Sequence, residues 1–231
     1  MRLHRFIGNF DLAQKTVAVS DGELVNQWRN VLRLKTGDKL ILCDGVGHEA
    51  EATITDMDKK TITVAIGTVS APEREGRKKA QLFCALLKRE NFELVVQKAT
   101  EIGITRITPL ITERTIKTGF NRERLEKIIR EASEQSGRTS LPVLSDPIKF
   151  GEALETIASK EAMLFDLSGQ EVKLESFTAL RLKSFFIGPE GGFTESEVEE
   201  ARKAGCAIAS LGSLTLRGET AAIVVSYLAT Q

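Results

Sequence analysis

Cysteine and histidine are both scarce in this 231-residue sequence, which has three of the former and two of the latter. Cys43, Cys84 and Cys206 lie far apart within apolar stretches and form no CxxC pair. Their odd number and wide spacing argue against a disulfide framework and a zinc knuckle, and predict core thiols in a reducing cytoplasm. Both histidines, His4 and His48, fall within the first 70 residues. This excludes a Ser-His-Asp triad from the rest of the chain, and no metal site is expected.

Long apolar runs are also missing. No stretch approaches the roughly 20 uninterrupted apolar residues that a membrane span requires. The opening residues, MRLHRFIGNF, lack the apolar run of a signal peptide. Hydrophobic residues make up 42% of the chain and charged residues 28%, as in an ordinary folded protein. We therefore expect a globular cytoplasmic protein without a membrane anchor.

Two common nucleotide-binding motifs are missing or stand in the wrong context. No GxxxxGK[ST] pattern occurs, which excludes a P-loop. Residues 45–50, GVGHEA, match the loose dinucleotide pattern GxGxx[GA]. Alternating strand residues follow them where a helix would be required, so we interpret this segment as a hairpin turn.

A net charge of one sign is lacking too, because 32 basic residues balance 32 acidic ones. The distribution is nevertheless uneven: residues 71–140 carry fifteen basic and ten acidic side chains, whereas residues 141–231 carry eight and thirteen. Such an asymmetry indicates a polyanion partner for the middle segment, although solvated helix faces produce similar runs.

The first 70 residues have the two-residue periodicity of strands. The segments KLILCDG, EAEATITDM and TITVAIGTV alternate in polarity and are separated by DG and DKK turns, which predicts a small antiparallel sheet or barrel. One short helix is expected at 21–32. The polar segment 70–79 contains Pro and Gly and is typical of a linker. We place a domain boundary near residue 72, giving domains 1–71 and 72–231.

Beyond this boundary, strands and helices alternate. Alternation of this kind predicts an α/β domain with a parallel sheet covered on both faces. The helix at 194–204 opens with Thr194-Glu195-Ser196-Glu197, which fits a capping box. Strands are expected at 81–87, 107–111, 162–167, 184–188 and 207–211, and helices at 91–103, 122–135, 149–158, 194–204 and 219–229.

Two loops stand out where strands of this sheet end, the position at which open α/β sheets bind ligands. The first, residues 188–192 (GPEGG), has three glycines in five positions and directly precedes the capped helix. Glycines there allow backbone N–H groups to approach a ligand closely, but a plain tight turn has the same pattern. The second, residues 211–221 (LGSLTLRGETA), places leucines in a loop beside an Arg/Glu/Thr cluster. Arg217 and Glu219 there could form an ordinary salt bridge or hold a substrate.

These two loops, IGPEGGFTESEVEEA and LGSLTLRGETAA, resemble the cofactor-binding loops of the SPOUT (trefoil-knot) methyltransferases. Further stretches are similar, in the same order, to the RsmE family, and the resemblance covers nearly the whole chain: RFI, VLRLKTGDKLILCDG, LLKRENFELVVQKATEIGITRITPLITERT and EASEQSGR. The sequence departs from the usual family pattern at 213–215, where Ser-Leu-Thr replaces the common Pro-Arg-Ile, and at Gln27, where a histidine often stands.

The resemblance implies a fold and an activity that periodicity does not show. It implies a C-terminal α/β trefoil-knot domain, an N-terminal PUA-like β domain that binds RNA, and a homodimer. It also implies S-adenosylmethionine as cofactor, 16S ribosomal RNA of the small subunit as partner, and methylation of the N3 position of a uridine. N3 of uracil carries a proton, so the enzyme must favour the uracil anion while it holds N3 in line with the methyl group.

The resemblance and the loop composition together suggest roles for individual residues. Arg217 is the candidate for stabilising the developing negative charge, Glu219 for orienting Arg217 or accepting the proton, and Thr220 for binding either ligand. The expected cofactor-binding residues are Phe165, Asp166, Leu167, Gly188, Pro189, Glu190, Gly191, Gly192, Leu211, Gly212, Leu214, Leu216 and Ala221. The expected RNA-binding residues are Arg5, Lys88, Arg89, Arg114, Gln135 and Arg138.

Two alternative functions are compatible with the sequence. One is methylation by a SPOUT enzyme at another RNA position, either a tRNA base or a ribose 2′-hydroxyl. The other is a non-catalytic RNA-binding assembly factor that keeps the fold. A C5-methylation through a covalent cysteine adduct is disfavoured, because no cysteine lies in either loop.

Overall fold

The structure is a computed structural model that describes residues 3–72, 79–116, 119–157, 161–172 and 183–231. It divides into two compact units. The first consists of Met1–Glu75 and Ser133–Leu141, and the second of Gly76–Ala132 and Pro142–Gln231. Most of the expected linker at 70–79 lies outside the described residues. None of the helices described in these ranges is long and apolar enough to cross a membrane.

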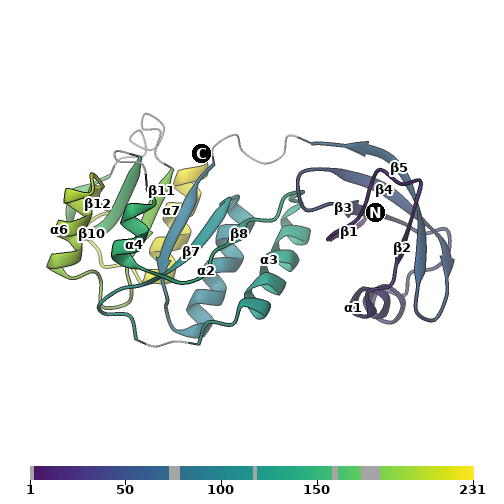
Figure 1. The fold of residues 1–231 in the computed structure, drawn as a ribbon, viewed down its shortest axis with the longest axis horizontal. Helices are drawn as coiled ribbons and strands as arrows, with labels where there is room; N and C mark the ends of the chain where they lie inside the picture. Colours follow the sequence, from purple (N-terminus) through teal and green to yellow (C-terminus); the bar gives the residue numbers. More distant parts are fainter. Residues whose placement is uncertain (1–2, 73–78, 117–118, 158–160, 173–182) are drawn as a thin grey trace. The chain divides into compact units, whose positions relative to one another are not determined.

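The first unit is built on a five-stranded sheet with the strand order β1-β3-β4-β5-β2 (Figure 1). Its elements are β1 (His4–Ile7), β2 (Thr16–Val19), α1 (Gly22–Asn26), the π-helical turn η1 (Gln27–Val31), β3 (Lys39–Cys43), β4 (Glu49–Met57) and β5 (Ile62–Ser70). The expected helix at 21–32 is therefore two short pieces, of which the second is a π-helix.

The sheet of this unit differs in one pairing from the antiparallel sheet expected. β1 pairs parallel with β3, whereas β3–β4, β4–β5 and β5–β2 are antiparallel. The chain between β1 and β3 contains β2 and both helical pieces, which is long enough for the crossover that a parallel pair needs. The interpretation of 45–50 as a hairpin is confirmed, because Gly45 (φ 81°) and Gly47 (φ 127°) connect β3 to β4.

Trp28, from η1, lies at the centre of the core of the first unit. Its side chain is fully buried, and its ring centroid is 4.8 Å from that of Phe6. The inward-facing residues of all five strands complete this core, including Leu40, Ile54 and Val64. The alternating pattern read from the sequence is thus the alternation between this core and the opposite face of the sheet.

Among the described residues, the second unit contains a seven-stranded sheet in which every pair of strands is parallel. The strand order is β12-β10-β11-β6-β7-β8, and β9 also pairs with β7. Its elements are β6 (Gln81–Ala85), α2 (Arg89–Ile102), β7 (Arg106–Ile111), α3 (Arg122–Ser136), β8 (Val143–Leu144), β9 (Ile148–Lys149), α4 (Phe150–Glu155), β10 (Ala162–Glu171), β11 (Ser184–Ile187), α6 (Glu195–Lys203), β12 (Ala207–Ser210) and α7 (Gly218–Thr230).

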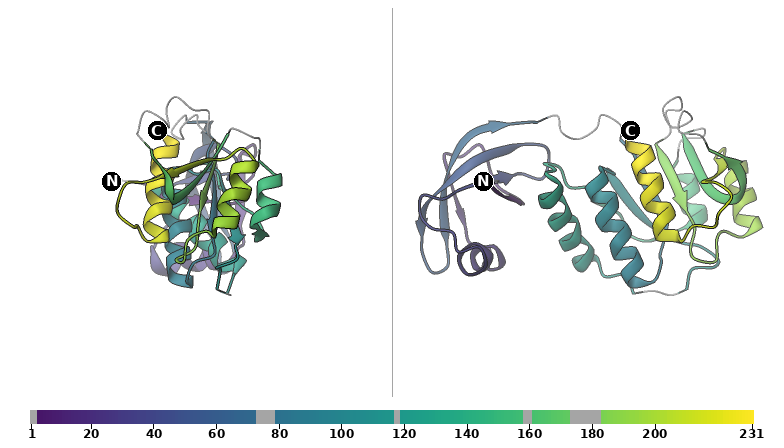
Figure 2. Two further views of the ribbon diagram at one scale, coloured as in Figure 1. Left: turned by 90° about the vertical axis from the view of Figure 1, so that its left-hand side faces the viewer. Right: turned by 180° about the vertical axis from the view of Figure 1, so that it is seen from behind.

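Helices cover both faces of this sheet, as the alternating pattern predicted. α2 and α7 pack together on one face, and α4 and α6 lie on the other (Figure 2). The core under α4 and α6 contains Phe83 and Phe186, whose rings stack with centroids 4.4 Å apart. α4 ends at Glu155, earlier than expected, and the last predicted residue of that helix lies outside the described residues.

The last two elements of the chain bring its end back to the middle of the sheet. β12 is an edge strand, yet α7, which follows it, packs on α2 and contacts β6 and β11. The 211–217 loop therefore carries the chain from the edge strand to the carboxyl ends of the central strands. This path places the second of the two unusual loops next to the first.

Candidate active site

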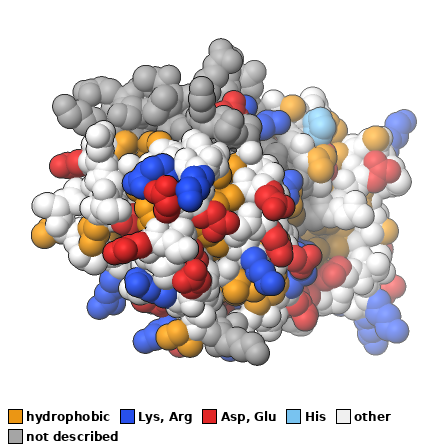
Figure 3. Space-filling view, turned by 60° about the vertical axis from the view of Figure 1, so that its left-hand side comes forward, with side chains coloured by type: hydrophobic (Ala, Val, Ile, Leu, Met, Phe, Trp, Pro, Cys, Tyr) orange, Lys and Arg blue, Asp and Glu red, His pale blue; other side chains and the backbone are white. Residues whose placement is uncertain are grey.

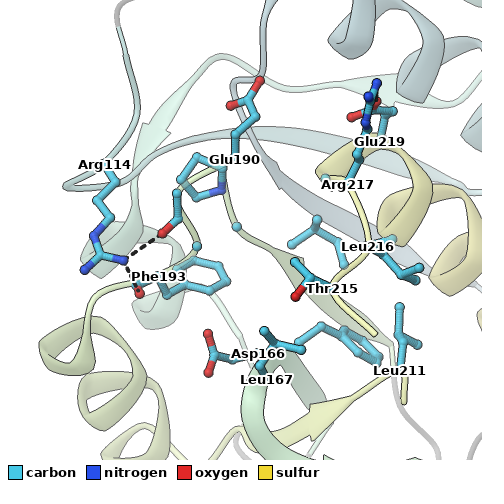
Figure 4. A pocket seen from close by; sticks show the side chains of 18 of the residues that line it. Arg114, Asp166, Leu167, Glu190, Phe193, Leu211, Thr215, Leu216, Arg217 and Glu219 are labelled. Carbon is cyan, nitrogen blue, oxygen red and sulfur yellow. Dashed lines mark hydrogen bonds and ion pairs between the residues drawn. The ribbon is translucent and has the colours of Figure 1, made fainter. Parts of the chain in front are cut away.

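A cavity of about 660 Å³ opens at the carboxyl ends of β11 and β12 and beside the middle of β10, next to the N-terminus of α7 (Figure 4). Its volume falls within the range of about 300–1,000 Å³ that is usual for small-molecule sites. The residues that line it are Lys88, Asn91, Arg114, Phe165, Asp166, Leu167, Ile187, Gly188, Pro189, Glu190, Gly191, Gly192, Phe193, Ser210, Leu211, Leu214, Thr215, Leu216, Arg217, Gly218, Glu219 and Ala221.

The first wall is the 188–193 loop, which connects β11 to α6. The predicted capping box is present: Thr194 accepts a hydrogen bond from the backbone N–H of Glu197, and the Glu197 side chain accepts one from Thr194. The backbone N–H of Gly192 (φ 69°) donates to the Pro189 carbonyl at 2.8 Å, which closes a tight turn. The loop is thus held at both its turn and its exit into the helix.

The second wall is the 211–217 loop, which connects β12 to α7. Leu214 is 77% exposed and Leu216 is 37% exposed, and both line the cavity. Gly212, at φ 120°, has a backbone conformation that L side chains rarely adopt, so this turn requires glycine. Exposed leucines beside a cavity form an apolar surface that a ligand can cover.

The third wall is the middle of β10, where the strand is irregular. Phe165 and Gln170 both pair with Ala209 of β12, so residues 166–169 bulge out of the ladder. A Cβ on Gly169 would come within 2.5 Å of the Ala209 backbone, so no other residue fits this crossing. Asp166, in the bulge, accepts hydrogen bonds from the N–H and hydroxyl of Ser168 and lines the cavity.

Arg217 and Glu219 meet at the N-terminus of α7, but their ion pair is weak. The closest atoms, Arg217 Nη1 and Glu219 Oε1, are 3.9 Å apart. The arginine side chain is 85% exposed, whereas that of the glutamate is only 10% exposed. Among the described residues, none forms a hydrogen bond with the buried Glu219 Oε2, so this carboxylate oxygen is unsatisfied in a residue that lines the cavity.

A cysteine lies close to this pocket in space, although neither loop contains one. Cys84, near the end of β6, is fully buried. Burial, together with the negative charges of Glu190 and Glu219, raises the pKa of its thiol. A buried thiol that resists ionisation is not a nucleophile, so the argument against a covalent cysteine adduct rests on burial and charge, and not on distance. Cys43 and Cys206 are buried thiols, as expected.

The structure brings most of the predicted pocket residues together. All thirteen proposed cofactor-binding residues except Gly212 line the cavity, as do Arg217 and Glu219. Thr220 is exposed and does not line it. Sequence reasoning missed Asn91, Ile187, Phe193, Ser210, Thr215 and Gly218. Three of these, Ile187, Phe193 and Ser210, directly flank the loops at 188–192 and 211–221, so including the residue on each side of a loop would have found them.

The predicted RNA-binding residues are in different environments. Arg5 donates hydrogen bonds to Glu49 and to the Cys43 sulfur, and its side chain is 9% exposed. Arg138 is 4% exposed. Little of either side chain is therefore accessible to RNA, because Arg5 forms an ion pair with Glu49 and Arg138 is buried. Gln135, by contrast, is exposed.

The positive charge of the middle segment is partly neutralised by local ion pairs. Arg89 and Arg124 both contact Glu93. Arg122 contacts Glu126 and Asp146. The face in Figure 3, on which the α6 end of Figure 1 comes forward, also has basic and acidic side chains next to one another. The charge count alone therefore overstates how positive this segment is.

Comparison with known proteins identifies the family. Residues 74–230 match the RNA methyltransferase domain family, and residues 29–67 match the RNA methyltransferase PUA domain family. The chain is 33% identical to ribosomal RNA small subunit methyltransferase E of Rickettsia conorii, over 96% of this chain and 93% of the relative. It is 31% identical to the protein of the same name from Bacillus subtilis, over 87% of this chain and 84% of the relative.

A solved structure agrees with these matches. The fold superposes with a TM-score of 0.89 on a ribosomal RNA small subunit methyltransferase E from Neisseria gonorrhoeae bound to S-adenosyl methionine, at 29% identity, covering 97% of this chain and 95% of that one. The chain belongs to the ribosomal RNA small subunit methyltransferase E family, which confirms the resemblance read from its loops. The expected fold, an α/β methyltransferase domain with a PUA-like β domain, is confirmed as well.

Proposed function

We propose that this protein transfers a methyl group from S-adenosylmethionine to N3 of a uridine in 16S ribosomal RNA of the small subunit. The observation that carries the proposal is the cavity in which the 188–193 and 211–217 loops meet. Relatives that match 96% and 87% of the chain are named for small-subunit ribosomal RNA methylation. One neighbour with the same fold holds S-adenosylmethionine.

The residues of the cavity fit this cofactor. Leu211, Leu214 and Leu216 supply an apolar wall, and the glycines at 188, 191 and 192 let backbone groups approach a ligand closely. Asp166 and Glu219 supply carboxylates that suit a positively charged molecule. When bound, S-adenosylmethionine supplies a methyl group on a positively charged sulfur. The protein has to hold that methyl group in line with the acceptor and handle the acceptor's proton.

Glu219 is the residue that suits the proton of N3. Its buried Oε2 has no hydrogen-bond partner in the part of the chain that the structure describes, and Glu219 lines the cavity. In the proposed step the proton of N3 passes to Glu219, the bond from sulfur to the methyl carbon breaks, and a bond from that carbon to N3 forms. Arg217, which is 85% exposed and lines the cavity, is the proposed group for stabilising the negative charge of the uracil. Thr220, exposed in the first turn of α7, remains a candidate ligand-binding residue.

RNA binding is proposed for the exposed residues Lys88, Arg89 and Gln135, together with the PUA-like domain. A polyanion partner would make affinity fall steeply as salt rises. We also propose a homodimer that uses α7, because Val224 and Tyr227 on this helix are 36% and 56% exposed. Domain limits at 1–71 and 72–231, a trefoil knot along the path from β12 to α7, and a cytoplasmic location complete the proposal.

Methyl transfer to isolated small subunits tests the function directly. Purified protein is incubated with labelled S-adenosylmethionine and, in separate reactions, with small subunits or total tRNA from a strain that lacks the gene, and the RNA is then digested to nucleosides for mass spectrometry. The expected product is 3-methyluridine in 16S RNA. Label in a tRNA base or in a ribose 2′-O-methyl group would support another SPOUT activity. No transfer, with no heat on titrating the cofactor, would support a non-catalytic assembly factor.

A further inference from the structure

Arg114 directs its guanidinium toward the protein's own backbone, although the sequence placed it among the RNA contacts. Its Nη1 donates to the carbonyl of Gly191 at 2.7 Å and to that of Phe193 at 3.3 Å (Figure 4). Both acceptors belong to the 188–193 loop. A Cβ on Gly191 would lie 3.4 Å from Arg114 Cδ, so the arginine side chain packs directly over that glycine. Arg114 thus contacts the loop through both its head group and its stem.

The segment that carries Arg114 is itself fixed. It follows β7, and the N–H of Thr112 donates to Thr115 Oγ1 at 2.9 Å. The N–H of Glu113 donates to Glu197 Oε1 at 2.9 Å, which ties the segment to the same capping box that ends the 188–193 loop. Because its own backbone is held, Arg114 works as a rigid support for the loop.

The side chain of Glu190, which belongs to the loop, attaches it to a second segment of the chain. Glu190 Oε1 accepts a hydrogen bond from the backbone N–H of Lys88, the residue that caps the N-terminus of α2, at 3.1 Å. The loop is therefore attached to the segments after β6 and after β7. A loop held in its binding shape before the ligand arrives spares the ordering cost that binding would otherwise incur.

We propose that Arg114 is a positioning residue that holds the 188–193 loop in the shape that binds the methyl donor, and that it is not an RNA contact. The proposal rests on the proposed function, because the ligand of the loop is S-adenosylmethionine. Because Arg114 donates to backbone carbonyls of the 188–193 loop through Nη1, it affects the ligand by way of the loop. Its loss should therefore weaken cofactor binding and leave RNA binding unchanged.

The test compares Arg114→Ala and Arg114→Lys with Arg202→Ala in the full-length protein. Arg202 is a matched control, since it is an exposed arginine of α6 that pairs with Glu199 and does not line the cavity. Three quantities are measured: the Kd for S-adenosylmethionine by calorimetry, the affinity for small subunits without cofactor, and hydrogen exchange of the 188–193 amides without ligand.

Arg114→Ala is expected to raise the cofactor Kd about tenfold, equal to about 1.4 kcal/mol, with unchanged affinity for small subunits. Exchange at 188–193 should accelerate, and kcat should recover at saturating cofactor while KM rises. Arg114→Lys should recover part of the loss, because an ammonium group can still donate to a carbonyl but lacks the planar fork of arginine. Arg202→Ala should leave all three quantities unchanged.

The proposal is overturned if Arg114→Ala leaves the cofactor Kd and loop exchange unchanged and weakens RNA binding, with the salt slope reduced by about one. If Arg114→Ala does not fold, Arg114→Lys and its loop exchange decide the question. Wild-type protein that binds no S-adenosylmethionine would refute the proposed function, whereas the exchange comparison would still report whether Arg114 holds the loop.

Discussion

Replacing Glu219 by glutamine separates the two roles that the sequence suggested for this residue. The substitution keeps the size of the side chain and removes its ability to accept a proton. If Glu219 only orients Arg217, the loss is that of their ion pair. At 3.9 Å and an effective dielectric constant of about 20, the Coulomb energy would be about 4 kcal/mol.

The exposure of Arg217 lowers this value considerably. With an arginine that is 85% exposed, the pair belongs to the surface class, which contributes at most about 1 kcal/mol. Loss of the pair would therefore slow methyl transfer by about fivefold at most. Loss of a general base slows a reaction by about 10²–10⁴-fold. The two roles thus differ by more than tenfold in rate.

The assay is single-turnover methyl transfer to small subunits from the deletion strain, at saturating S-adenosylmethionine. We expect Glu219→Gln to be slower than wild type by about a hundredfold or more. Glu195→Gln is the matched control, because Glu195 is an exposed acid in the first turn of α6. A loss of fivefold or less in Glu219→Gln would refute the role as proton acceptor and leave only the ion pair.

Three further outcomes are expected. Cys84→Ala should retain methyl transfer close to the wild-type rate, because the thiol is buried with a raised pKa; abolished transfer in a folded variant would contradict this. Burial pushes the pKa of Asp44 upward, but hydrogen bonds from N–H groups of the β3–β4 turn outweigh it and lower the pKa. The stability that this carboxylate contributes is therefore present above the unfolded-state pKa of about 3.9 and is lost as pH falls through the folded value. The Tm difference between wild type and Asp44→Asn should shrink at acid pH, and a difference that stays constant would contradict this. Tyr227→Glu on α7 should give a monomer in sedimentation, and a stable dimer of this variant would refute an interface on that helix.

Local patterns in the sequence predicted the elements that local physics determines. The capping box at Thr194 and Glu197 is present in the structure, and Gly103, with φ 112°, is the C-cap of α2 and the last residue of the helix expected at 91–103. The edge of the sheet where the loops meet followed from a general property of parallel sheets. These features depend on a few neighbouring residues, so a single sequence is enough to find them.

Contacts between distant segments could not be predicted in this way. The hydrogen bond from the Lys88 N–H to Glu190 joins residues 102 positions apart, and those from Arg114 to the 188–193 loop span nearly 80. Arg5 was predicted to contact RNA, but its side chain forms an ion pair with Glu49 within the first unit. The sequence around a basic residue does not indicate whether its side chain will contact an RNA phosphate or a carbonyl of its own chain.

The sequence also could not predict every segment of the two structural units. The sequence suggested one boundary near residue 72, whereas Ser133–Leu141 group with the first unit. The backbone N–H of Leu141 donates to the Gly45 carbonyl, and that of Gly47 donates to the Thr139 carbonyl. A short polar segment after a helix carries no periodicity that would reveal such pairing with a hairpin almost 100 residues earlier.

Nucleoside analysis of 16S ribosomal RNA from the organism, with and without this gene, tests the central claim most directly. In the deletion strain, 3-methyluridine should disappear from one site of 16S RNA, and it should return when the wild-type gene is supplied but not when Glu219→Gln is supplied. A deletion strain whose 16S RNA keeps its full content of 3-methyluridine would contradict the account.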